Sequence, residues 1–142
     1  MDAIARRAKM RYRKLNRYKY QLVSQHTFHL PFNPPKDILT PFIKYELDGK
    51  LIVRKGYSWN GSNMSQDTKH CMRASLVHDI LCQLIREGFL SYEYLEEANL
   101  LYRQMCIEDG MNPLRAELRL LGLRIGSKKA VESGVDDRVY EV

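Results

Sequence analysis

The 142-residue chain has no long run of apolar residues, and it contains only three cysteines and one tryptophan. No stretch approaches the roughly 20 apolar residues that a membrane-spanning helix needs, which excludes a transmembrane span. The N-terminus lacks the apolar core of a secretory signal, so we expect no secretion by that route. Cys71, Cys82 and Cys106 form no C-x-x-C pair, and their odd number argues against a disulfide framework or a zinc knuckle. We therefore expect free thiols, no bound metal and no cofactor.

Positive charge is concentrated at the N-terminus. Residues 1–19 carry eight basic side chains and one acidic one, whereas the rest of the chain has a net charge of −1. The basic residues are Arg6, Arg7, Lys9, Arg11, Arg13, Lys14, Arg17 and Lys19. Such a block is typical of a segment that binds an anionic partner, and tyrosines beside it could stack on bases. Nucleic acid and an acidic protein surface are both open as the anionic partner, because no RNP, zinc-finger or helix-turn-helix signature accompanies the charge. The alternative to binding is a solvated basic helix that only aids solubility.

The order of patterns predicts an α+β fold, with a small antiparallel sheet in the N-terminal half packed on three C-terminal helices. Residues 3–14 predict a short basic helix, and residues 18–30 predict a strand. Residues 38–47 and 51–55 predict a hairpin around Asp48-Gly49, and residues 56–66 predict a loop. The expected organisation is a basic arm over residues 1–17, a single domain over residues 18–126 and a peripheral tail over residues 127–142.

Capping residues predict the bounds of the three helices. The first is expected to begin at Asp67-Thr68 and to stop at Gly88. The second is expected to begin at the N-cap Ser91 and to end near Gly110. The third is expected to begin at Asn112-Pro113, to end near Gly126 and to turn an apolar face to the core, composed of Leu114, Leu118, Leu121 and Ile125.

Polar residues interrupt the apolar faces of the first two helices. The first helix has a stripe of small and polar residues at steps of 4, 3 and 4, which are Cys71, Ser75, His78 and Cys82. On the second helix, Asn99 shares a stripe with apolar and aromatic residues. A buried asparagine must be hydrogen-bonded, so we expect Asn99 to pair with His78 or Asp79.

His78 and Asp79 are the candidate catalytic residues. Neighbouring residues on a helix point about 100° apart, so these two would serve different partners, as a base and as an orienting or metal-binding carboxylate. The alternative is a structural histidine beside a surface or capping acid.

Several motifs, in order, resemble a family of tailed-bacteriophage and prophage proteins catalogued as domain of unknown function 1353. The matching segments are 19–22 (KYQL), 55–61 (KGYSWNG), 67–69 (DTK), 72–79 (MRASLVHD), 83–88 (QLIREG) and 108–111 (EDGM). The resemblance spans about residues 18–130. It implies a site where the loop and two helices converge, and it implies no known reaction.

Two aspartates of that family pattern are asparagines in this chain, the family's usual tyrosine is Cys82, and a Gly-Pro element of the loop is shortened to residues 62–65. The family has W-D-G, H-D and A-D where this chain has Trp59-Asn60-Gly61, His78-Asp79 and Ala98-Asn99. An asparagine keeps the hydrogen bonding of an aspartate but not the charge that hard cations require. The departure therefore favours a structural polar network of Trp59, Asn60, Gly61 and Asn99 over metal-dependent catalysis.

The sequence supports three hypotheses about function. The favoured one is a phage-encoded virion-associated or assembly protein that binds other phage structural proteins or nucleic acid through residues 1–19. It would act in the host cytoplasm during infection or in the virion. The second is a small hydrolase or host-modifying enzyme that uses His78 and Asp79, and the third is a nucleic-acid-binding accessory protein that uses the basic arm alone.

Overall fold

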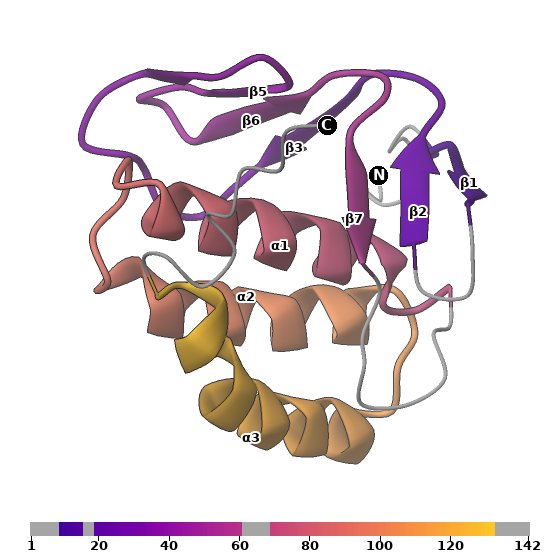
Figure 1. The fold of residues 1–142 in the computed structure, drawn as a ribbon. Helices are drawn as coiled ribbons and strands as arrows, with labels where there is room; N and C mark the ends of the chain where they lie inside the picture. The colour runs from indigo at the N-terminus through magenta and orange to yellow at the C-terminus, as the bar shows by residue number, and fades with distance from the viewer. Residues whose placement is uncertain (1–8, 16–18, 61–68, 133–142) are drawn as a thin grey trace, which may run out of the picture. The chain divides into compact units, whose positions relative to one another are not determined.

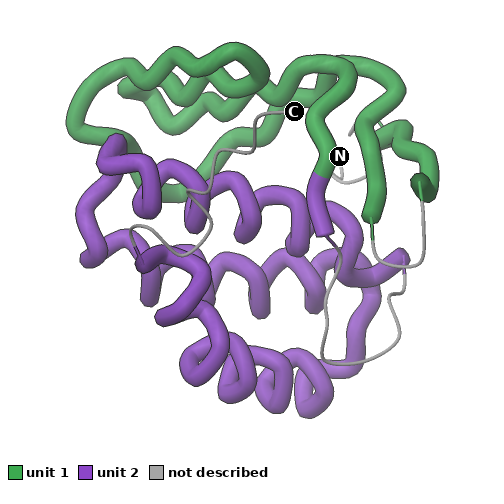
Figure 2. The backbone as a smooth tube through the Cα atoms, viewed as in Figure 1, with its two compact units in different colours: residues 1–58 green, residues 59–142 purple. Residues whose placement is uncertain are grey.

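The computed structural model describes residues 9–15, 19–60 and 69–132, and the expected α+β class is confirmed there (Figure 1). Strands come first, as β1 (Tyr12–Lys14), β2 (Lys19–Leu22), β3 (His26–His29), β4 (Ile38–Leu39), β5 (Ile43–Tyr45), β6 (Lys50–Val53) and β7 (Ser58–Asn60). Helices follow, as α1 (Met72–Arg86), α2 (Tyr94–Glu108) and α3 (Pro113–Ala130). The chain divides into two compact units, residues 1–58 and residues 59–142 (Figure 2).

The strands form two antiparallel sheets rather than the single sheet predicted, with the orders β1-β2-β7 and β3-β6-β5-β4. The strand predicted over residues 18–30 is broken at residues 23–25, so that its halves, β2 and β3, belong to different sheets. The predicted loop over residues 56–66 contains β7, and its residues from 61 onward lie outside the described ranges.

The helix predicted over residues 3–14 is wrong where the structure describes it, because Tyr12–Lys14 is strand β1. Residues 1–8 lie outside the described ranges. β1 pairs with β2 so that Arg13 is opposite Gln21, and the rings of Tyr12 and Tyr20 meet edge to face with centroids 5.8 Å apart. The apolar side of the predicted helix was thin, so strand pairing and this aromatic contact outweigh the local helix propensity.

The hairpin predicted at Asp48-Gly49 is confirmed between β5 and β6. Gly49 has φ +94°, a conformation that favours glycine, and the Asp48 carboxylate accepts a hydrogen bond of 3.0 Å from the Lys50 backbone N–H. The buried side chains of this sheet make the core of the first unit and include Phe28, Ile38, Ile43, Tyr45, Leu51 and Val53.

Two of the predicted helix ends are correct. Gly88 follows α1 with φ +85°, and the Asn112 side chain caps α3 by accepting a hydrogen bond of 2.9 Å from the Leu114 N–H. α1 begins later than predicted, at Met72 after Cys71, and the predicted cap Asp67-Thr68 lies outside the described residues.

Two other predicted ends are wrong. The N-cap position of α2 is Glu93 rather than Ser91, and its side chain makes no capping hydrogen bond. The Ser91 carbonyl closes a turn with the Tyr94 N–H at 3.1 Å. α3 continues past Gly126 to Ala130. Because Ser127 and Val131 are buried, the first part of the predicted peripheral tail packs within the helical unit.

The orientation predicted for α3 is also wrong. The four residues expected in the core are exposed, at 71% for Leu114, 60% for Leu118, 50% for Leu121 and 80% for Ile125. The buried face of α3 is composed of Ala116, Arg119, Leu120 and Ser127 instead. The Arg119 guanidinium donates a hydrogen bond of 3.2 Å to the Tyr102 hydroxyl. This face of α3 therefore gives buried polar groups of α2 a hydrogen-bond partner, whereas the leucine face would leave those groups unpaired.

Candidate functional site

The helical unit contains a buried polar cluster centred on His78. His78 Nε2 lies 2.7 Å from Asn99 Oδ1, so His78 is the one of the two predicted partners, His78 and Asp79, that Asn99 contacts. Both side chains are buried, at 7% and 2% exposure. An amide oxygen can only accept a hydrogen bond, so Nε2 carries the ring proton and donates it to Asn99.

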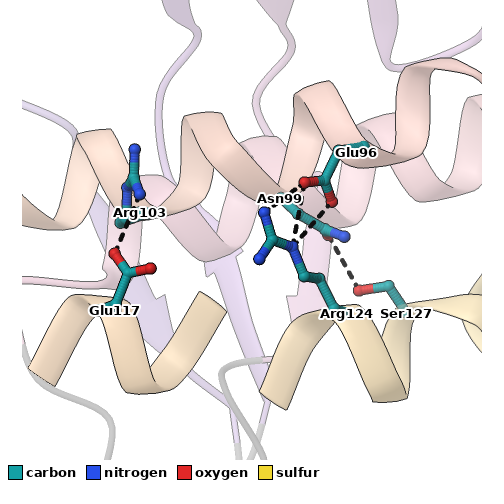
Figure 3. A network of polar contacts seen from close by, with 6 residues as sticks. All are labelled: Glu96, Asn99, Arg103, Glu117, Arg124 and Ser127. Atoms are coloured by element: carbon teal, nitrogen blue, oxygen red, sulfur yellow. Dashed lines mark hydrogen bonds and ion pairs between the residues drawn. The ribbon is translucent and has the colours of Figure 1, made fainter. Parts of the chain in front are cut away.

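Ser127 of α3 is the third member of the cluster (Figure 3). Its hydroxyl donates to Asn99 Oδ1 at 3.1 Å and lies 3.4 Å from His78 Nε2. The sequence reasoning placed Ser127 in a peripheral tail and missed this role. A signal was present, since Ala116, Leu120 and Ser127 recur at helical spacing on one face.

Cys82 lies on the other side of the His78 ring. Its Sγ is 3.7 Å from His78 Nδ1. Because the ring proton is on Nε2, Nδ1 accepts a hydrogen bond from the thiol. Burial of Cys82, with a smaller contribution from the Asp79 carboxylate, raises the pKa of the thiol to about 12. Thiol, imidazole and amide are the groups that some cysteine hydrolases use, but the nucleophile there is a thiolate. This thiol is protonated at neutral pH and only 3% exposed.

Burial also decides the charge of the imidazole. It lowers the pKa of His78 below the ordinary value of 6.5, against the opposing effect of the hydrogen bond with Asn99. The ring is therefore neutral at pH 7, and its face is covered by Tyr102, whose ring centroid is 5.7 Å away in an edge-to-face contact. A neutral histidine that is hydrogen-bonded at both nitrogens holds three helices together without a buried charge.

Asp79 serves different partners, as the angle between neighbouring helix residues predicted. Its Oδ2 accepts a hydrogen bond of 3.2 Å from the Asn60 backbone N–H. Burial raises the pKa of Asp79 to about 7, although the bond from Asn60 and the positive charge of Arg86 both act to lower it. The carboxyl group is therefore partly protonated near neutral pH.

Trp59 is anchored next to this contact. Its indole N–H donates to the Ser75 hydroxyl at 3.0 Å, and that hydroxyl donates in turn to the Met72 carbonyl at 3.0 Å. The residues predicted as one polar network thus occupy two neighbouring sets of contacts on α1. Trp59 and Asn60 meet Ser75 and Asp79, while Asn99 meets His78. Gly61 lies outside the described residues.

Two ion pairs join α2 and α3, and the pair of Glu96 with Arg124 lies beside Asn99 (Figure 3). Arg124 donates to the Glu96 carboxylate at 3.0 Å, and Arg103 donates to Glu117 at 3.0 Å. The bond from Arg124, with a smaller one from the Asn99 amide, lowers the pKa of Glu96. A surface depression of about 380 Å³ lies beside the Glu96–Arg124 ion pair, and Asn99 also lines it. His78, Asp79 and Cys82 do not line this depression.

Within residues 9–15, 19–60 and 69–132, no three His, Cys, Asp or Glu side chains are grouped so that they could hold a metal ion. No helix in those ranges is long and apolar enough to span a membrane.

The described part of the basic N-terminal segment is exposed and includes strand β1. Lys9, Arg11, Arg13, Lys14 and Lys19 are all exposed, while Arg6, Arg7 and Arg17 lie outside the described residues. β1 is an edge strand of its sheet. The Arg11 carbonyl accepts from the Val23 N–H, and the Leu15 N–H donates to the Lys19 carbonyl. In an antiparallel ladder these bonds direct the backbone groups of Tyr12 and Lys14 away from β2.

Comparisons of the chain with protein-family models, with curated proteins and with solved structures find no match. The motif resemblance to the phage family therefore stays a prediction from the sequence.

Proposed function

We propose that the chain is a bacteriophage-encoded virion-associated or assembly protein that acts by binding, with the basic segment of residues 1–19 as its contact surface. The observation that carries this proposal is the group of exposed cations just before and within the edge strand β1, at Lys9, Arg11, Arg13 and Lys14. The phage assignment rests on the ordered motifs of the sequence. Binding is proposed in place of catalysis because the polar groups of α1 have structural partners.

The chemistry of the His78 cluster supports this choice. A general base needs a proton to abstract within hydrogen-bond reach, and a nucleophilic cysteine needs a thiolate. His78 has Asn99 and Cys82 at its two nitrogens, and the pKa of the Cys82 thiol is raised to about 12. These groups hold α1, α2 and α3 together, which leaves the surface to carry the function.

An acidic segment of another phage structural protein is the partner that fits β1. The outward backbone groups of Lys14 could pair with an added strand, and main-chain hydrogen bonds of this kind give affinity to many extended ligands. The side chains of Arg11, Arg13 and Lys14 would then meet carboxylates on the added strand. Nucleic acid could use the same cations but would leave the strand edge unused.

The test uses two triple variants that lower the net charge by the same amount. Arg11→Glu/Arg13→Glu/Lys14→Glu changes the strand edge, and Lys36→Glu/Lys44→Glu/Lys55→Glu changes exposed lysines elsewhere in the first unit. Phage that lacks the gene is complemented with each form, and particles and assembly intermediates are analysed by quantitative mass spectrometry. We expect the wild-type protein and the second variant in these fractions, and the first variant reduced by about tenfold or more, which corresponds to about 1.4 kcal/mol.

Absence of the wild-type protein from both fractions, or full retention of the strand-edge variant, would contradict the proposal. A parallel titration with labelled duplex DNA at several salt concentrations addresses the nucleic-acid alternative. If DNA binding is salt-dependent and lost in the strand-edge variant while particle association is unchanged, nucleic acid replaces protein as the partner.

A further inference from the structure

The exposed face of α3 has the pattern of a coiled-coil seam. Leu114, Leu118, Leu121 and Ile125 follow one another at steps of 4, 3 and 4, which is the spacing of alternate d and a positions in a heptad. Each of the four is at least half exposed. The opposite face of the helix, with Ala116, Leu120 and Ser127, is buried within the helical unit. Four large apolar side chains in one row form a contiguous patch of the kind that marks an interaction site.

We infer that this face is a dimer interface, in which α3 packs antiparallel against α3 of a second copy of the chain. The spacing 4-3-4 reads the same in both directions, so a two-fold axis that crosses the stripe between Leu118 and Leu121 makes it self-complementary. Leu114 then lies opposite Ile125 of the second copy, and Leu118 lies opposite Leu121 of the second copy. Every exposed apolar side chain of the stripe gains an apolar partner.

The charges beside the stripe favour this direction of pairing. Glu117 and Arg124 each precede an a-type residue, so they occupy equivalent g positions. In an antiparallel pair g positions face each other, which brings Glu117 beside Arg124 of the second copy. In a parallel pair, Arg124 would instead approach Lys129 of the second copy, a repulsive contact between two exposed cations.

The ion pairs already present in each chain extend this match. Glu117 is bound by Arg103, and Arg124 is bound to Glu96 (Figure 3). The Glu117 and Arg124 side chains are nonetheless 47% and 42% exposed, so each retains surface for a second contact. In the dimer, Arg103 and Glu117 of one copy would be followed across the interface by Arg124 and Glu96 of the second copy. These four neighbouring side chains alternate in charge. Such a network is worth more than isolated surface pairs.

The first experiment measures the mass of the full chain by sedimentation equilibrium over a range of concentrations. The wild-type protein is expected to dimerise, and Leu118→Glu is expected to weaken dimerisation by about 100-fold or more, because a carboxylate would be buried in an apolar seam. Leu47→Glu is the matched control, since Leu47 is similarly exposed, at 53%, and lies off the stripe. It is expected to dimerise like the wild type. A wild-type protein that stays monomeric, or a Leu118→Glu variant that dimerises normally, would overturn the inference.

The second experiment tests the direction and does not depend on the stability of Leu118→Glu. Leu114→Cys and Ile125→Cys variants are oxidised separately and as a mixture. In the antiparallel dimer the two introduced cysteines meet only in the mixture, because two copies of Leu114→Cys lie about 16 Å apart along the helix axis. The three native cysteines are buried, at no more than 3% exposure, and provide no competing thiol at the surface. Crosslinking of Leu114→Cys with itself would indicate a parallel pair and contradict the inference.

Discussion

Replacement of Asp79 by asparagine is expected to stabilise the protein at neutral and alkaline pH and to have no effect in acid. Burial raises the pKa of Asp79 from an ordinary value of 3.8 to about 7 in the folded state. A raised carboxyl pKa favours the folded state below pH 4, and this contribution is lost as the pH rises towards 7. An asparagine has no such titration, and its amide oxygen can still accept from the Asn60 N–H.

The size of the stabilisation by Asp79→Asn follows from the shift of the Asp79 pKa on folding. About three pH units at 1.36 kcal/mol per unit set a ceiling of about 4 kcal/mol. Asp79 is only partly shielded from solvent, and solvent screening lowers the real cost. We expect Asp79→Asn to raise the free energy of unfolding by about 2 kcal/mol at pH 8 and by nothing at pH 4. His78 has the opposite pH dependence, since its lowered pKa makes its contribution disappear as the pH falls below 6.5.

The assay is urea unfolding at several pH values between these limits, followed by the fluorescence of Trp59. Trp59 is the only tryptophan, and it is buried against Ser75, so it reports on the helical unit itself. Glu97→Gln is the control, because it removes the same charge from an exposed position on α2. The reasoning is refuted if Asp79→Asn is no more stable than the wild type at pH 8, or if its gain is the same at pH 4 and pH 8.

Three further predictions follow from single contacts. Ser127→Ala removes the hydroxyl that donates to Asn99, so it is expected to lower the free energy of unfolding by about 1 kcal/mol in the same assay; an unchanged value would show that the bond adds nothing. Gly49→Ala is expected to destabilise by more than about 1 kcal/mol in thermal melts, because φ is +94° and the added Cβ would lie 2.8 Å from the Leu30 carbonyl oxygen; a wild-type melting temperature would contradict this. All three native thiols, including Cys82, are expected to react with a thiol reagent only as fast as the protein opens, and prompt labelling in the folded state would disprove their burial.

Local signals predicted the parts of the fold that local chemistry determines. Asp48-Gly49 specifies its own turn, and Gly88 and Asn112 end and begin helices through their own backbone and side-chain preferences. The contact of His78 with Asn99 was also predictable, because a polar residue within an otherwise packed stripe requires a partner on the neighbouring helix.

The errors arise where a distant partner decides the outcome. Hydrophobic periodicity assumes that the most apolar face of a helix is buried, yet α3 buries the face that serves Asn99 and Tyr102 and exposes Leu118 and Ile125. The sequence of α3 alone does not determine which of its faces is buried, because the choice depends on which polar groups of α2 need hydrogen-bond partners.

The N-terminal segment shows the same limit. Its alanines and basic residues favour a helix, but the Tyr12 side chain packs against Tyr20 on the paired strand. No local sequence pattern predicts this strand pairing. The role of Ser127 was missed for a related reason, since a helix predicted to end at Gly126 leaves the next residue outside the core.

The most direct test of the account is the ring ¹⁵N spectrum of His78, recorded from about pH 8 to about pH 5 and assigned with a His78→Gln variant. In the folded protein this histidine is a neutral core residue that is hydrogen-bonded at both ring nitrogens, and the proposed function then resides on the surface. We predict that the ring is mainly uncharged at pH 6.5, because burial lowers its pKa, with a proton on Nε2 and none on Nδ1. Titration near 6.5, as for a solvent-accessible base, or a proton on Nδ1 would contradict the account and return His78 to the candidate catalytic residues.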